Sequence, residues 1–380
     1  MKSKHALSFL FSILTTTVCM LMMPTTFAFA APPVDLSGMP DNAVNAYNLG
    51  STESGIEDIQ PTPSNSSGYA EKWDFILESD KFNLRVKFEI SNFAFSKNEG
   101  KIRGYLATNE NGTEQRYELS QTFKKSEWTS ETKGLNLTFG EYKVSYDGTS
   151  FHLDGVYEKG NFHFDIPANL WKPGTGNVYF GNSEENIFRY NLLTYHKTAK
   201  GYYTENGQKH EVSPRAYGNH YVTTVAVYDM YDEFADFRRN EEDIVVEFRY
   251  YVPSAKYPSE PFGFMFVAYR GVPVFSSTKL ERTPQETWLD EDNYNYEIDA
   301  RQRLTATDTE GNKAIMEMLT AVPTPSDPYA DLPAFQRNIA SRFAKPIEYS
   351  IKIDWELWLT VEGMKAKIPA TGTYSLTRMR

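Results

Sequence analysis

The sequence predicts an all-β protein whose antiparallel sheets close on themselves or on each other. Residues Lys81–Ile90 carry an apolar side chain at every second position. Because successive side chains of a strand point to opposite faces, this spacing gives one buried and one exposed face. Similar segments recur to the end of the chain, separated by turns that contain glycine. A closed sheet of this size can enclose a pocket, so the pattern also bears on function.

The first thirty residues are expected to be a secretory signal peptide. Lys2 and Lys4 precede the apolar stretch Ala6–Met23, and Ala28–Ala30 forms a small-x-small cleavage site. The cleavage site argues against a membrane anchor, and no later stretch reaches the roughly 18 apolar residues that a spanning helix needs. We therefore expect a secreted protein, periplasmic or extracellular, with no stable membrane span.

Composition and charge exclude several classes of function. The single cysteine, Cys19, lies inside the signal, and no small residue precedes it as lipidation requires, so we expect no disulfide and no thiol chemistry. The formal net charge is −11 and becomes more negative once the signal is removed. This sign repels phosphate backbones, so nucleic acid is not an expected partner. About 350 residues remain, which is enough for two units.

The first unit is expected to span residues 69–214. Residues 31–68, rich in Pro, Ser, Asn and Gly, are expected to form a flexible leader or an extended arm before it. Asn111-Gly112, Asp147-Gly148 and Lys159-Gly160 mark hairpin turns, where glycine supplies a positive φ. The expected strands are Lys72–Leu77, Lys81–Ile90, Ile102–Thr108, Gln115–Leu119, Leu135–Tyr146, Phe151–Tyr157, Asn161–Ile166, Ile187–Tyr195 and Gly201–Thr204.

The second unit is expected to span residues 215–380. Its expected strands are Val222–Val227, Ile244–Val252, Phe262–Tyr269, Val272–Phe275, Tyr294–Leu304, Ala314–Leu319, Ile347–Leu359 and Thr373–Leu376. One segment departs from the strand pattern, because Asp331–Ala344 places Leu332, Phe335, Ile339 and Phe343 along one helical face. Asp331 can cap this short helix and Pro346 ends it. We expect it either to cover the end of a barrel or to fill a surface groove.

Three stretches resemble one protein superfamily. Lys200–Val212 is similar to a hairpin at the junction of two barrels, and Ala216–Tyr221 to the Gly–aromatic–His strand that opens the second barrel. Tyr329–Phe335, followed by Ala344–Tyr349, looks like a helix and strand near the end of such chains. The superfamily is the tandem lipocalin-like one, which includes carotenoid 1,2-hydratases, bacterial AttH-type proteins and fungal oxidative-stress survival factors.

The resemblance covers about residues 69–380 and implies two consecutive lipocalin-like (calycin) antiparallel barrels that handle a lipid or terpenoid. Two departures stand out. Many relatives place an Asp-His pair after the aromatic residue of the second stretch, where this chain has Thr223 and Thr224. At Thr223 and Thr224 the acidic group that a hydratase could use therefore has no counterpart. The second departure is that the survival factors are intracellular, whereas this chain carries an export signal.

Two functions remain in view, together with a third without any ligand. The first is a secreted binding protein or carrier for a hydrophobic small molecule held in a barrel or inter-barrel cavity. The alternative is a non-metal, cofactor-free cyclase or hydratase acting on a terpenoid or polyene in the same cavity. The third is an interaction protein. No serine nucleophile elbow, Walker loop, dinucleotide fingerprint or HExxH motif occurs in the sequence, so no cofactor is expected.

Aromatic residues make up 15% of the chain, and such rings suit the lining of an apolar site. The residues expected to contact a ligand are Tyr217, His220, Tyr221, Trp171, Trp288 and Tyr296. In the alternative function, His220 moves a proton and Asp229 supplies a carboxylate partner. The competing explanation is that the rings fill the cores, that backbone groups satisfy His220, and that Asp229 is a surface acid.

Two acidic or histidine-rich segments invite a metal interpretation. His152 and Asp154 share one strand face, His163 and Asp165 share another, and the two strands are expected to pair as a hairpin. Their opposite faces are apolar, so these four side chains fit the exposed face of the sheet, and no metal site is expected. The turn at 290–293 lacks the central glycine and final glutamate of an EF-hand loop and is expected to be an ordinary acidic turn.

Overall fold

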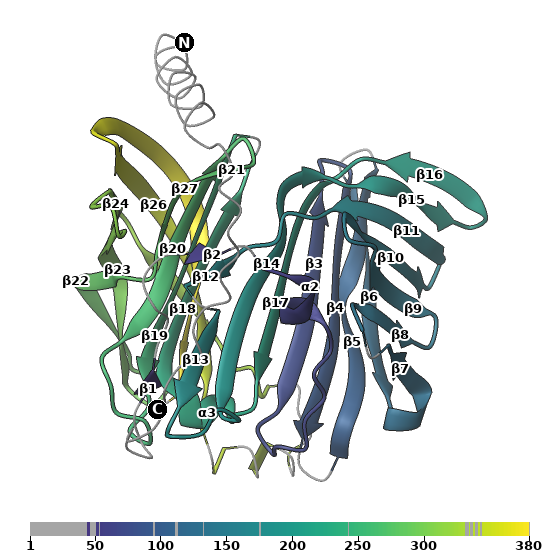
Figure 1. The fold of residues 1–380 in the computed structure, drawn as a ribbon, viewed down its shortest axis with the longest axis horizontal. Helices are drawn as coiled ribbons and strands as arrows, with labels where there is room; N and C mark the ends of the chain where they lie inside the picture. The colour runs from purple at the N-terminus through teal and green to yellow at the C-terminus, as the bar shows by residue number, and fades with distance from the viewer. Residues whose placement is uncertain are drawn as a thin grey trace.

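The computed structural model confirms an all-β protein (Figure 1). It describes residues 44–45, 51–52 and 54–379, apart from 94–95, 111–112, 132, 175, 242, 331–333, 335–336, 339–340 and 343. The expected signal peptide with Cys19, the start of the leader and the turn at 111–112 lie outside the described residues. In the described part of the chain, no helix is both long enough and apolar enough to cross a membrane.

The first sheet has eight strands in the order β1-β13-β14-β17-β3-β4-β5-β6, paired antiparallel. They are β1 (Val44–Asn45), β3 (Ala70–Glu78), β4 (Phe82–Phe93), β5 (Ser96–Glu110), β6 (Thr113–Phe123), β13 (Asn177–Phe180), β14 (Ile187–Thr198) and β17 (Arg215–Thr223). The expected boundary after residue 214 falls just before β17. Strand pairing runs across that point, because β17 lies between β14 and β3 in the middle of the sheet.

The second sheet has seven strands in the order β16-β15-β11-β10-β9-β8-β7. They are β7 (Trp128–Ser130), which follows the short 3-10 helix η1 (Lys125–Glu127), then β8 (Asn136–Phe139), β9 (Tyr142–Tyr146), β10 (Ser150–Tyr157), β11 (Gly160–Pro167), β15 (Lys200–Glu205) and β16 (Gln208–Val212). The expected strand Leu135–Tyr146 is therefore a hairpin. Gly140 has a φ of 58°, which lets the chain turn back at that position.

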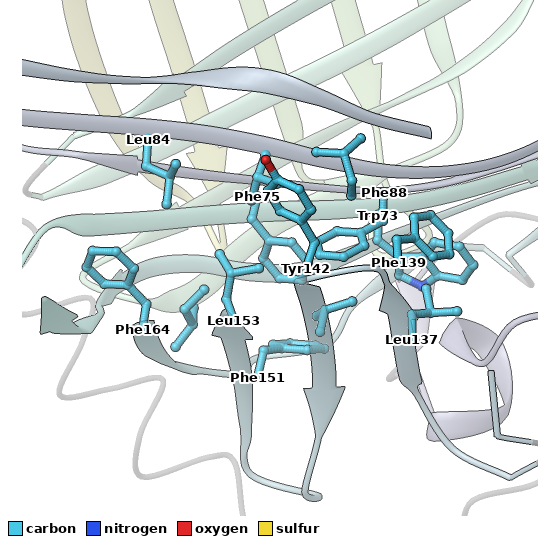
Figure 2. Packing of buried hydrophobic residues seen from close by; sticks show 14 of the residues in the cluster. Trp73, Phe75, Leu84, Phe88, Leu137, Phe139, Tyr142, Phe151, Leu153 and Phe164 are labelled. Carbon is cyan, nitrogen blue, oxygen red and sulfur yellow. The ribbon is translucent and has the colours of Figure 1, made fainter. Parts of the chain in front are cut away.

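The first two sheets enclose the N-terminal core (Figure 2). Alternate residues of β3 and β4, among them Trp73 and Phe88, point toward the second sheet. Phe139, Phe151 and Leu153 of the second sheet point back at them, and all five side chains are 0% exposed. Each such residue stabilises the fold by about 1.5–3 kcal/mol relative to an exposed position. The period-two pattern of the sequence thus becomes one closed apolar interior.

The third sheet has ten strands and forms the C-terminal barrel, with the main order β21-β20-β19-β18-β27-β26-β24-β23-β22 and β25 beside β26. Its strands are β18 (Tyr231–Asn240), β19 (Ile244–Pro253), β20 (Phe262–Tyr269), β21 (Val272–Ser277), β22 (Leu280–Asp290), β23 (Tyr296–Thr307), β24 (Lys313–Met318), β25 (Val322–Ser326), β26 (Ile347–Val361) and β27 (Met364–Arg378). The inner-facing residues of these strands share one apolar core, so the sheet curls around it.

A third apolar cluster lies between the first sheet and the C-terminal barrel, which stand side by side in Figure 1. We call it the seam. It gathers residues from the outer face of the first sheet and the outer face of the barrel. They are Ile76, Trp171, Val178, Phe180, Phe188, Tyr190, Leu192, Tyr195, Tyr217, Val225, Met230, Val245, Tyr251, Tyr257, Phe262, Phe264, Phe266 and Ala268. β17 and β19 are therefore buried on both of their faces.

Three local expectations differ from the structure or lie outside it. The expected strand Val222–Val227 ends at Thr223 and is followed by the short helix α3 (Val227–Met230). Residues 31–68 were expected to form a flexible leader or an extended arm. From Ser54 onward they pack on the first sheet and include α2 (Ile56–Ile59), while β2 (Ser51–Thr52) pairs with β12 (Lys172–Pro173), which fits the arm and not the flexible leader. The four apolar positions of the expected helix 331–344 lie outside the described residues.

Candidate functional site

One carboxylic acid lies at the centre of the seam. Glu247 on β19 is 0% exposed. The Tyr190 hydroxyl donates to its Oε1 at 2.5 Å and the Tyr217 hydroxyl to its Oε2 at 2.9 Å. The two phenol oxygens are also 2.9 Å apart. Tyr190 comes from β14 and Tyr217 from β17, so two strands of the first sheet hold an acid of the C-terminal barrel.

A buried arginine completes the group. Arg249 Nε donates to Glu247 Oε1 at 3.3 Å and lies 3.4 Å from Asp236 Oδ1. Its guanidinium carbon lies 4.0 Å from the centroid of the Tyr190 ring. Glu247 and Arg249 are two residues apart on β19, so both point to the seam and away from the barrel interior. A buried charge is tolerated only with such partners.

Burial changes the acidity of these groups. It is the largest influence on Glu247 and raises the pKa of its carboxyl above the ordinary value, although Arg249 acts in the opposite direction. Burial also raises the pKa of Tyr190 and Tyr217 well above that of an exposed tyrosine. Burial works against a charged Arg249, but the acidic groups around it, Asp236 foremost, raise its pKa. A carboxyl with a raised pKa keeps its proton to higher pH and can donate it.

Aromatic rings surround this acid. Trp171 packs 4.5 Å from Phe266 and 5.6 Å from Phe264 between ring centroids, and Phe264 stacks on Tyr190 at 5.3 Å. The Trp171 indole Nε1 is buried and has no hydrogen-bond partner among the described residues. The seam therefore combines an apolar aromatic lining, a protonatable acid and an unused hydrogen-bond donor. Such a combination is typical of a site for an apolar molecule with few polar groups.

His220 lies on the other face of β17 from Tyr217 and Tyr221. It points into the N-terminal barrel, where it is 0% exposed, and its Nε2 is 2.9 Å from Glu71 Oε1. Its Nδ1 is 3.2 Å from the amide nitrogen of Asn191, and its ring stacks on Trp73 with 4.9 Å between centroids. Both ring nitrogens therefore have side-chain partners.

The segment from Ser54 to Thr62 covers this histidine. The Thr62 backbone N–H donates to Glu71 at 2.8 Å, and Asn191 donates to the Asp58 carbonyl at 3.1 Å. Lys172 and Asp58 form an ion pair of 2.6 Å at the edge of the segment. The two partners of His220 thus also anchor this segment. The strand β17 itself separates the histidine from the acid in the seam, because His220 and Tyr217 point to opposite faces of it.

The remaining predicted residues occupy different places. Tyr221 and Trp171 lie at the seam with Tyr217. Trp288 and Tyr296 belong to the core of the C-terminal barrel, where Trp288 packs edge-on against Tyr349. Asp229 lies on α3 and pairs with Lys256 at 2.6 Å near the surface. Three of the predicted ligand residues are therefore brought together, and the other predicted residues are not.

The histidines and aspartates of β10 and β11 form a surface ladder. The expected hairpin is present, and its register pairs His152 with Asp165 and Asp154 with His163. Each imidazole lies 2.7 Å from the opposite carboxylate. Among the described residues, no group of three or more His, Cys, Asp or Glu is arranged to hold a metal ion. These four side chains pair across the hairpin on the exposed face of the second sheet.

A small surface pocket of about 290 Å³ lies beside the end of the C-terminal barrel. Its lining includes Tyr294, Tyr329, Arg337 and Lys345. The Lys345 ammonium sits 4.9 Å from the centre of the Tyr294 ring. The pocket is polar and lies apart from the residues of the seam.

The sequence contains a signal for the buried acid that strand alternation alone does not reveal. The strand Ile244–Val252 reads as an almost continuous apolar run, as expected of a strand buried on both faces. Glu247 and Arg249 interrupt it at positions of the same face. Charged residues are almost never fully buried without partners, so this pair marks a buried polar site. Tyr190 has no comparable signal, because tyrosine is common in strands.

Comparison with known proteins finds similar solved structures at low sequence identity. No protein-family model matches the sequence, and no curated protein matches it closely enough to count as a relative. The chain is similar to an AttH-type structure from Nitrosomonas europaea, with 13% identity, 84% of this chain and 95% of that chain covered, and a TM-score of 0.48. Kievitone hydratase from Nectria haematococca has 10% identity, coverage of 90% and 97%, and a TM-score of 0.48. CghA with Sch210972 has 11% identity, coverage of 87% and 98%, and a TM-score of 0.42.

Proposed function

We propose that this protein is a cofactor-free hydratase or cyclase that protonates an apolar, unsaturated molecule such as a terpenoid or polyene at the seam. The observation that carries the proposal is Glu247, a fully buried carboxyl with a raised pKa, held between two tyrosine hydroxyls. A carrier needs apolar area and a polar contact or two, but it does not need a buried acid. The acid therefore favours catalysis over transport.

Apart from the water molecule that a hydratase adds, the chemistry requires only groups that this chain supplies. Glu247 donates its proton to one carbon of a C=C bond, and the other carbon becomes cationic. In a hydratase, water adds to that carbon and returns a proton to the carboxylate. In a cyclase, a second C=C bond of the same molecule adds instead, and the proton lost from the ring product restores the acid. In both cases the acid is regenerated and no oxidant or reductant is consumed.

The surroundings of Glu247 suit each step. Tyr190 and Tyr217 orient the carboxyl and stabilise the carboxylate that remains after proton transfer, because both hydroxyls already donate to it. Aromatic faces such as that of Phe264 stabilise a cationic carbon nearby. Exclusion of bulk water from the seam strengthens these interactions and limits side reactions, and a hydratase would admit one water molecule together with its substrate. We propose that the protein performs this reaction after export, as its N-terminal sequence indicates.

Deuterium incorporation tests the proposal whichever product the reaction forms. The mature protein is incubated in D₂O with lycopene or geranylgeraniol in detergent, and the recovered molecule is analysed by mass spectrometry. We expect incorporation of deuterium by the wild type and a loss of about 10²–10⁴-fold in Glu247→Gln. Glu286→Gln is the matched control, since Glu286 lies on the outer face with a side chain that is 60% exposed.

Two results would contradict the proposal. If Glu247→Gln incorporates deuterium as fast as the wild type, Glu247 is not the acid. If the wild type binds these molecules, and the molecules extracted from it afterwards carry no deuterium, the seam is a carrier site. The second result would support the simpler function of a hydrophobic-ligand carrier.

A further inference from the structure

The segment that covers His220 is held by hydrogen bonds to the neighbours of this histidine. We call residues 54–62 the strap. Its Asp58 and Ile59 are buried, and Ile59 belongs to the N-terminal core. Their backbone carbonyls accept hydrogen bonds from Asn191 at 3.1 Å and from the Trp73 indole at 2.8 Å. Both donors also touch the His220 ring, so the strap is tied to the surroundings of one titratable group.

The side-chain amide of Asn191 determines which nitrogen of His220 carries a hydrogen. Its Nδ2 donates to the Asp58 carbonyl at 3.1 Å and its Oδ1 accepts from the Ser54 hydroxyl at 3.0 Å, so these two bonds orient the amide. The second N–H of Nδ2 then points at Nδ1 of His220, 3.2 Å away. Nδ1 is therefore an acceptor without a hydrogen, and Nε2 donates to Glu71 at 2.9 Å. This arrangement requires a neutral imidazole.

A second proton on the imidazole is incompatible with these bonds. Protonated Nδ1 would direct its N–H at the N–H of Asn191, and two donors cannot bond each other. If the amide rotates by half a turn, its oxygen accepts from His220, but the same oxygen then faces the Asp58 carbonyl. The Ser54 hydroxyl can accept from the rotated amide, so the Asp58 carbonyl alone loses its donor. An unpaired buried carbonyl is costly, which favours release of the strap at that point.

The other titratable groups around the imidazole leave this effect in place. Glu71 on β3 accepts from the Tyr69 hydroxyl at 2.7 Å and from the Thr62 backbone N–H at 2.8 Å, and it can accept from a neutral or a charged imidazole. The Asp58 carboxylate is paired with Lys172 of β12 at 2.6 Å. Protonation therefore loosens the strap around the Asp58 carbonyl, whereas the end at Thr62 stays attached.

We propose that His220 and Asn191 form a pH-sensitive switch that holds the strap closed near neutral pH and releases residues 54–60 in acid. Release gives water access to the buried imidazole. It also loosens β12, which the strap holds through Lys172 and which directly follows Trp171 of the seam. The switch operates whether or not Glu247 transfers a proton, so it does not depend on the proposed reaction.

Hydrogen exchange of the mature protein without any ligand tests the proposal. Protection factors are measured at a pH of about 7.5 and of about 5, the range in which histidine side chains ordinarily change their charge. We expect the backbone amides of Asp58 and Gln60, which bond to carbonyls within the strap, to lose protection about tenfold or more at the lower pH. The Thr62 amide should keep its protection, because Glu71 still accepts from it.

Two variants separate the switch from a general effect of acid. His220→Gln has no group that takes up a proton at this position, so the strap should be equally protected at both pH values. Asn191→Asp places an oxygen against the Asp58 carbonyl permanently, so it should release the strap at both pH values. His163→Gln is the matched control, since His163 pairs with Asp154 on the exposed face of the second sheet, and it should behave as the wild type.

Three results would overturn the proposal. The first is equal protection of the wild-type strap at both pH values. The second is a loss of protection in His220→Gln at the lower pH that is as large as in the wild type. The third is a strap in Asn191→Asp that is as protected as the wild type at the higher pH. Glu247→Gln should retain the switch, which separates it from the reaction proposed at the seam.

Discussion

Replacement of Glu247 by glutamine or leucine tests whether the seam holds a neutral acid. Glutamine has nearly the same shape and keeps a carbonyl oxygen for a tyrosine donor. If Glu247 is protonated at neutral pH, Glu247→Gln should change the free energy of unfolding by less than about 1 kcal/mol. Leucine removes the acceptor of Tyr190, Tyr217 and Arg249 together. The two hydroxyls can still bond each other, so we expect Glu247→Leu to cost about 2–4 kcal/mol.

The stability difference between the wild type and Glu247→Gln should change with pH in a direction that the pKa of Glu247 determines. Burial raises the pKa of Glu247 in the folded state, so the folded protein holds this proton more tightly than the unfolded chain. The resulting stabilisation is fully present below the unfolded pKa of about 4.3 and is lost as the pH rises through the folded pKa. Glutamine does not titrate. Glu247→Gln should therefore gain stability relative to the wild type as the pH rises.

The assay is urea denaturation of the wild type and both variants at a series of pH values from about 4.3 upward. An ionised Glu247 would behave differently, because removal of one partner from a buried ion pair with Arg249 costs about 3–5 kcal/mol. A cost of that size for Glu247→Gln, constant with pH, would refute the reasoning. It would also remove the proton that the proposed reaction needs.

Three further predictions concern other parts of the molecule. Lys172→Met removes the ion pair with Asp58 of α2, and the loss of a partner from a buried pair should cost about 3–5 kcal/mol of stability. We expect faster amide exchange over residues 54–62, and unchanged exchange there would contradict the anchoring role. Gly104 has a φ of 150°, and a Cβ there would meet a backbone oxygen of the neighbouring strand at 1.9 Å, so Gly104→Ala should cost about 3 kcal/mol or more in a denaturation experiment. A hydrogen bond to Asp165 raises the pKa of His152, so this pair should stabilise the protein below a pH of about 6.5 and lose that effect as the pH rises through the folded pKa; an NMR titration with His152→Asn as control checks this.

Much of the fold could be read from alternation along single strands. The pattern of Lys81–Ile90 predicts β4 because its period of two is a property of the strand itself, and the turn at Lys159-Gly160 predicts the β10–β11 hairpin for an equally local reason. The break at Gly140 was not predicted in the same way, because a segment of twelve residues with recurring apolar positions is compatible with one long strand or with two short ones. Pairing partners decide between these possibilities.

The candidate site, too, was determined partly by the sequence and partly by the tertiary structure. We expected Tyr217 and His220 to contact one ligand, but alternation along β17 places them on opposite faces, so the strand pattern itself argues against a shared site. It also determined that Glu247 and Arg249 interrupt an apolar strand. Only the tertiary structure decided that Glu247 meets Tyr190, which is 57 residues away along the chain. The physical reason is that strand periodicity is local, whereas the face against which a buried strand packs depends on how separate sheets exclude water between them.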